Sequence, residues 1–170
     1  MDKQEARVIN DLMRRVEFLE KLERGFGVVP ACVVYNNANQ GIGSGAWAGI
    51  TYNTELTDTD NMHTAISPGL ITFNTPGIYA VGLQIEFAAN LAGQRFGRIL
   101  DSAGIQIALG GSNTVAGGFG TPLPLIATIR YFQSGQWVSS EAYQNSGGAL
   151  NVVFVVGAIS TPVFWAVRVG

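Results

Sequence analysis

The sequence predicts an all-β sandwich preceded by a short helical segment, and three observations lead to that fold class. The charges are concentrated at one end, because residues 1–24 hold 12 of the 22 Asp, Glu, Lys and Arg residues, and residues 25–170 contain no lysine. After residue 28 the apolar period changes from about 3.6 to about 2. Clusters of Gly, Asn, Ser and Thr separate the short apolar runs, as in a sandwich or jelly roll. We therefore expect a helical unit over residues 1–25 and a β domain over residues 28–170.

The helical unit carries its apolar residues at coiled-coil spacing. Ile9, Leu12, Val16 and Leu19 occupy alternating a and d positions, and Gly25 follows where helices commonly end. A helix of two heptads is marginal on its own in water. We therefore expect it to pack against its own copies, the β domain or a docking partner.

Strand periodicity is clearest in residues 77–90, where alternate residues are apolar. That face consists of Tyr79, Val81, Leu83, Ile85 and Phe87. The same alternation recurs in residues 105–109, 125–131 and 163–169. These segments are predicted to be half-buried strands.

The run over residues 150–156 differs, because it is apolar on both faces apart from Asn151. A strand covered on both sides of a sandwich has an outer face that meets another subunit. We therefore expect Val153, Phe154 and Val155 at a trimer interface.

Composition narrows the class of function. Charged residues make up 13% of the chain, about half the usual ~25%, which favours a buried subunit interface. A net charge of −2 gives no basic footprint for nucleic acid and no polybasic membrane patch. The sequence contains no run of about 18 apolar residues, so no membrane-spanning segment is predicted. The first residues carry no secretory signal, so we expect synthesis in a cytoplasm. Cys32 is the only cysteine; it lies in an apolar run and is expected to be a small buried hydrophobe.

Three stretches resemble the C1q/TNF-like head domain, in the version found in bacterial and bacteriophage proteins. Residues 45–55 place Trp47 before the first long strand, residues 58–63 form an Asp-rich segment ending in Met-His, and residues 75–79 give a Pro-Gly-aliphatic-Tyr strand entry. The resemblance covers residues 30–170.

The resemblance implies a C1q/TNF-like jelly-roll sandwich that assembles as a tight homotrimer and has no catalytic residues or cofactor. The chain lacks the collagen stem and secretion signal of the animal members, and a short coiled-coil-like segment stands in their place. This favours a non-enzymatic structural protein of a bacteriophage virion, displayed as a capsid decoration or head fibre and able to contact the host surface. Residues 1–25 would then dock on other virion proteins or clamp the trimer.

Other placements stay open from the sequence. One alternative is a tail-associated receptor-binding protein or a glycan-binding, lectin-like tip. Another is a trimer of a bacterial surface or spore coat.

Acidic residues provide the candidate metal ligands. Asp58 and Asp60, with Glu55 nearby, could supply oxygens to calcium, which some family heads carry. The structural alternative is a turn in which an Asp side chain bonds the backbone. His63 is the only histidine, and we expect it to make a structural hydrogen bond, with Asp58 or Asp60 as the candidate partners.

Aromatic residues provide the candidate ligand surface. Phe119, Trp137 and Tyr143 could stack on a glycan, although packing at strand ends explains them equally simply. Trp47 and Tyr52 are expected to be core aromatics.

Glu86 lies mid-strand beside apolar residues. If it is buried it needs a partner, and Arg95, Arg98 and Arg130 are available. A surface-facing Glu86 is the other interpretation.

Overall fold

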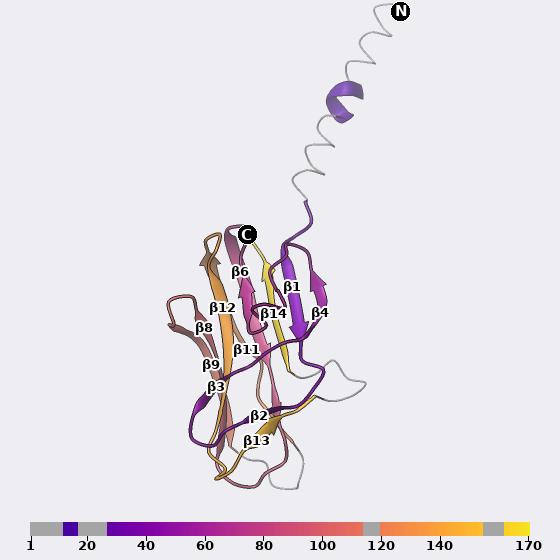
Figure 1. Ribbon diagram of the computed structural model, residues 1–170. Helices are drawn as coiled ribbons and strands as arrows, with labels where there is room; N and C mark the ends of the chain where they lie inside the picture. The colour runs from indigo at the N-terminus through magenta and orange to yellow at the C-terminus, as the bar shows by residue number, and fades with distance from the viewer. Residues whose placement is uncertain (1–11, 17–26, 114–119, 155–161) are drawn as a thin grey trace, which may run out of the picture.

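A computed structural model of the chain describes residues 12–16, 27–113, 120–154 and 162–170. Residues 12–16 are helical, and the rest of the described chain contains fourteen strands joined by turns and loops (Figure 1). The predicted all-β fold is confirmed. All strand pairs in the sheets are antiparallel, so each strand can bury one face and expose the other.

One large sheet, here called sheet I, contains both the first and the last strand of the fold. Its strands, in order across the sheet, are β11 (Ile126–Phe132), β6 (Gly77–Gln84), β14 (Val163–Arg168), β1 (Ala31–Tyr35) and β4 (Thr54–Asp58).

The opposing sheet, here called sheet II, is built around one long central strand. Its strands are β3 (Trp47–Gly49), β12 (Trp137–Gln144), β8 (Gln94–Asp101) and β9 (Gln106–Asn113), and β5 (Leu70–Thr72) also pairs with β12. Burial alternates strictly along β12, which shows that one of its faces lies against the core and the other faces outward.

A smaller sheet, here called the end sheet, lies at the end of the sandwich away from the C-terminus (Figure 1). Its strands are β10 (Thr121–Pro122), β7 (Glu86–Phe87), β13 (Leu150–Val152) and β2 (Gln40–Ile42).

The apolar face predicted for residues 77–90 forms part of the core. All five residues of that face are fully buried. The segment is two strands rather than one, because β6 pairs within sheet I and β7 pairs within the end sheet. The chain passes from one sheet to the other at Ile85, whose carbonyl accepts a hydrogen bond from the Leu123 backbone N–H.

The prediction of a long strand over residues 150–156 is wrong in its extent. β13 ends at Val152, after pairing with β2 over three residues. The Phe154 backbone N–H then donates to the Asn39 side-chain oxygen (2.8 Å) instead of joining a ladder. A side chain thus replaces the strand partner and ends the sheet.

Candidate functional site

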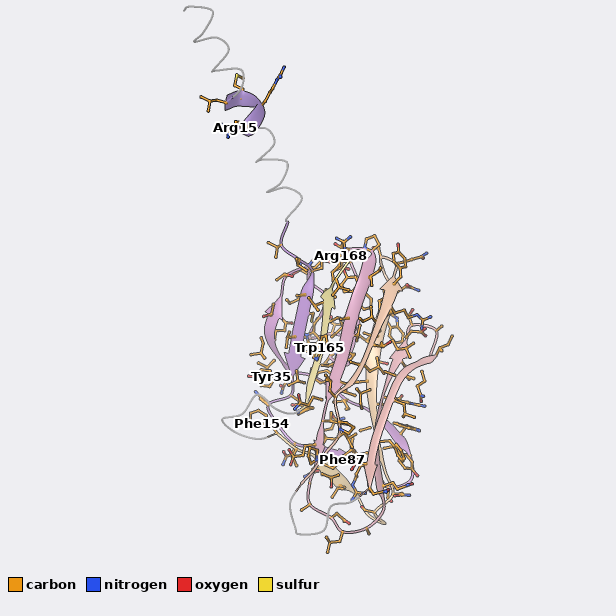
Figure 2. The ribbon with its side chains drawn as sticks, turned by 180° about the vertical axis from the view of Figure 1, so that it is seen from behind. Arg15, Tyr35, Phe87, Phe154, Trp165 and Arg168 are labelled. Atoms are coloured by element: carbon orange, nitrogen blue, oxygen red, sulfur yellow. The ribbon has the colours of Figure 1, made fainter. Side chains whose placement is uncertain are left out.

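The outer face of sheet I is mainly apolar and carries no charged residue. Side chains alternate along a strand, and residues directly opposite one another share a face, so the pairing registers identify the members of this face. They are Ala31, Val33, Tyr35, Thr54, Thr57, Ile78, Ala80, Gly82, Gln84, Ala127, Ile129, Tyr131, Val163, Trp165 and Val167. Figure 2 shows Trp165 and Tyr35 on this side of the molecule. We call these residues the association face.

The centre of the association face is shaped by Trp165. Trp165 lies opposite Gly82 on the neighbouring strand, and its indole occupies the space where a side chain at position 82 would stand. Toward the end sheet, Tyr35 stacks on Phe154, with 6.2 Å between ring centroids. Large aromatic rings therefore cover the middle and one end of the face.

The association face continues to the free edge of β11. Ile129 and Tyr131 are 69% and 57% exposed there, and Leu125 just before the strand is 60% exposed. Leu109 on β9, the edge strand of sheet II, is 52% exposed; it pairs with Arg98 and so lies on the outer face of sheet II, at the same open edge of the sandwich. An exposed apolar side chain is ordinary on its own, but a contiguous set of them marks an interaction surface.

The edge that carries these side chains is held rigidly. Ile126 points inward and fills the space above Gly97 and Gly110, where side chains would collide with it. Arg130 on β11 forms an ion pair with Asp101 on β8 (3.0 Å), which links the two sheets. The exposed side chains therefore project from a fixed frame.

The residues predicted for the trimer interface lie beside this face rather than at its centre. Val153 and Phe154 follow β13 and are half-buried, and Phe154 joins the association face through Tyr35. Val155 lies outside the described residues. In the helical seam, Leu12 and Val16 are each 52% exposed, and Ile9 and Leu19 lie outside the described residues.

The carboxylates proposed as calcium ligands serve a turn. Asp58 accepts hydrogen bonds from the backbone N–H groups of Asp60, Met62 and His63 (2.9–3.3 Å). Asp60 accepts one from the Thr75 backbone N–H (3.0 Å). Within the described ranges, no group of three or more His, Cys, Asp and Glu residues could hold a metal ion.

The structural hydrogen bond expected of His63 is present, but its side chain does not use the partners named from the sequence. The Nδ1 atom lies 2.9 Å from the Glu55 carboxylate, and Nε2 lies 3.4 Å from the Pro68 carbonyl oxygen. This pair borders a cavity of about 370 Å³. The cavity is lined by Tyr52, Asn53, Thr54, Glu55, His63, Ala65 and Pro68.

The two candidate ligand aromatics that the structure describes are not brought together. Trp137 and Tyr143 both project from the outer face of β12, six residues apart, which is about 20 Å along a strand. Phe119 lies outside the described residues. Tyr52 is a core residue as predicted, but Trp47 is half-buried on the outer face of sheet II, so its prediction as a core aromatic is wrong.

Glu86 has none of the predicted arginine partners. Arg98 pairs with Glu141 and Arg130 pairs with Asp101. Arg95 is fully buried, and its guanidinium donates to the backbone oxygens of residues 90, 92 and 94. The sequence does not predict this burial. Arg95 shares the inner face of β8 with Gly97 and Ile99, and the sequence alone does not show which face of the strand points inward.

The sequence matches no protein-family model and no curated protein. Solved structures do match the fold. The chain superposes on the globular domain of zebrafish complement 1qA with a TM-score of 0.58 and 14% identity, covering 83% of this chain and 98% of that one. Against Eiger TNF from S. frugiperda the TM-score is 0.59 with 12% identity, covering 84% and 93%. Against murine APRIL it is 0.63 with 8% identity, covering 83% and 99%.

These similarities establish the C1q/TNF jelly-roll fold. At such low identity they establish the fold alone, because one fold hosts many functions. No helix within the described part of the chain is long and apolar enough to cross a bilayer.

Proposed function

We propose that this protein is a non-enzymatic homotrimer displayed on the surface of a bacteriophage particle. The observation that carries the proposal is the association face. A single copy would expose a whole sheet face without a charged residue, together with large apolar side chains at the neighbouring edge. Surfaces of this kind are typical of a permanent interface between subunits.

The geometry favours three copies in a ring. The free edge at β11 and β9 exposes Leu109, Ile129 and Tyr131 beside the Arg130–Asp101 ion pair. The face across β6, β14 and β1 is mainly apolar and carries no charge, so the apolar side chains of one copy's edge fit the face of the next. Such a contact joins two different surfaces, and repeating it closes a ring when the rotation allows. C1q/TNF-like proteins are trimeric, which supplies the precedent for three.

Light scattering coupled to size exclusion tests the assembly. The full chain should elute as a trimer at micromolar concentration. Ile129→Asp should shift it to a monomer, because three carboxylates would be buried without partners. Ile66→Asp is the matched control, because Ile66 is 94% exposed and lies in the segment between β4 and β5, outside the association face. A monomeric wild type, or a trimeric Ile129→Asp variant, would contradict the proposal.

The particle assignment rests on two further features. The early β-domain motifs resemble heads of the bacterial and bacteriophage type, and a charge-rich segment of about two dozen residues precedes a domain that is poor in charge. A helix of that length spans about 36 Å at most, which suits a small decoration or head fibre better than a long fibre. Quantitative mass spectrometry of purified particles should find the chain in multiples of three. Its absence from particles of the encoding phage would overturn the assignment.

A further inference from the structure

The outer face of sheet II carries a row of aromatic side chains beside an ion pair. The pairing registers place these residues directly opposite one another across three strands. The first row, in order, is Trp47, Tyr143 and Phe96, and the second is Gly49, Glu141 and Arg98. We call Trp47, Tyr143, Phe96, Arg98 and Glu141 the outer strip.

The aromatic row is continuous. The ring centroids of Trp47 and Tyr143 lie 5.5 Å apart, and those of Phe96 and Tyr143 lie 6.1 Å apart. The Phe96 ring lies over Gly111 on β9, where a side chain would collide with it. Each ring is half-buried, so each rests on the sheet and still presents a surface to solvent.

The ion pair leaves one amino group of Arg98 and one carboxylate oxygen of Glu141 unused. Arg98 Nε donates to Glu141 Oε2 (2.7 Å), and Arg98 Nη2 lies 2.5 Å from the same oxygen in the ion pair. Among the described residues, Glu141 Oε1 accepts no hydrogen bond and Arg98 Nη1 donates none. The two side chains are 24% and 25% exposed, so the free groups can be reached from solvent. The guanidinium is also fixed against the Trp47 ring, 4.2 Å from its centroid.

A notch lies at the end of the second row. Gly49 stands opposite Glu141, and within the described chain no atom lies within 4 Å of where its side chain would be. A ligand group can therefore reach the carboxylate from this side.

From these features we propose that the outer strip binds an uncharged oligosaccharide. A pyranose ring has an apolar face of C–H groups that stacks on an aromatic ring, and its neighbouring hydroxyls each donate and accept hydrogen bonds. The rings supply the stacking surface, and Glu141 Oε1 with Arg98 Nη1 supply an adjacent acceptor and donor. The cation and anion cancel, so the strip does not select an anionic ligand such as nucleic acid.

The proposal deepens the display function and rests on it. A trimer formed through sheet I would leave sheet II facing outward on every copy. Three weak sites on one rigid body would then bind a glycan-covered surface with far higher avidity than one site.

The test is a glycan array probed with the fluorescently labelled full chain at about 10 µM, followed by calorimetric titration with the best neutral oligosaccharide. The wild type should bind neutral glycans, and Trp47→Ala should weaken binding by about tenfold or more. Trp47→Phe, which keeps a ring, should retain most of the affinity. Trp137→Ala is the matched control, because Trp137 lies on the same face of β12 outside the strip and its loss should leave affinity unchanged.

Three outcomes would overturn the inference: no neutral glycan bound, binding confined to anionic glycans, or equal losses for Trp47→Ala and Trp137→Ala. Light scattering on the same samples separates this inference from the display function. A trimer that binds no glycan would refute glycan binding by the outer strip and leave the proposed assembly intact. A monomer that binds neutral glycan through Trp47 would refute the trimer and leave the binding site intact.

Discussion

At the scale of single residues, the few polar groups of the β domain are committed to particular contacts. Asp58 closes a turn through three backbone N–H groups. Cys32 is fully buried, as its apolar surroundings predicted, and burial, with smaller contributions from Asp58 and Glu55, raises the pKa of its thiol from 9.0 to about 12. Substitutions at both residues should therefore change the stability of the folded domain.

Asp58→Asn should lower the free energy of unfolding by about 1–3 kcal/mol, because the amide leaves fewer acceptors for three backbone donors. Asp60→Asn should lower the free energy of unfolding by less, because the Asp60 carboxylate accepts only one such bond.

The unfolding temperature of the wild type should be the same with calcium and with EDTA, since the Asp58 and Asp60 oxygens already accept hydrogen bonds from the turn. A rise of several degrees in calcium would instead identify the acidic segment as a metal site.

The Cys32 thiol should make stability fall at alkaline pH. Its pKa is higher in the folded state, so its contribution is complete below pH 9.0 and is lost as pH rises toward about 12. Urea unfolding at about pH 8 and about pH 10.5 would measure this. The stability difference between wild type and Cys32→Ala should narrow at the higher pH. Burial also raises the pKa of Tyr52 and Tyr79, but the wild type and the Cys32→Ala variant share that effect, so it cancels in the difference. A constant or wider difference would show that the thiol is not shielded.

At the scale of elements, the sequence pattern located the strands better than it oriented them. Residues 125–131 alternate clearly, but Ile126 and Phe132 are apolar too, so either face could have been inward. The structure buries those two and exposes Ile129 and Tyr131, because Ile126 fills the space above two glycines. Only the packing of a distant strand decides this.

The outer strip was invisible for the same reason. Tyr143 was identified as a ligand candidate, but its neighbours Trp47 and Phe96 lie far away in the sequence and meet it only through strand register. Long-range pairing of this kind leaves no local pattern. Of the residues predicted to join Tyr143, Trp137 lies about 20 Å away along β12, and Phe119 lies outside the described residues.

Gly82 offers a test of the association face that does not add charge. Gly82→Ala should lift the Trp165 indole off β6, because no space exists for the added methyl group. We expect the domain to stay folded, with its free energy of unfolding lowered by about 1–3 kcal/mol. The dissociation constant of the trimer should rise by tenfold or more. Analytical ultracentrifugation would measure the dissociation.

Gly49→Ala is the control for Gly82, because Gly49 also lies in a strand but has open space above it. It should leave assembly unchanged. If both variants assemble like the wild type, Trp165 does not contribute to the interface.

At the scale of the whole molecule, charge is divided between two units. Residues 1–24 hold more than half of the chain's charged residues. In the β domain, Arg98, Arg130 and His63 have acidic partners, and Arg95 is enclosed. A chain divided in this way suits a head that hides its sides from water and a segment that stays solvated or docks elsewhere.

Deleting residues 1–24 should therefore separate assembly from attachment. The apolar core and the association face lie entirely within the β domain, so the shortened chain should keep its far-ultraviolet circular dichroism spectrum and its trimeric mass. Mixed with particles that lack the protein, the full chain should sediment with them and the shortened chain should stay in solution. A shortened chain that falls to monomers would instead make the segment a clamp. One that still sediments would place the attachment surface on the β domain.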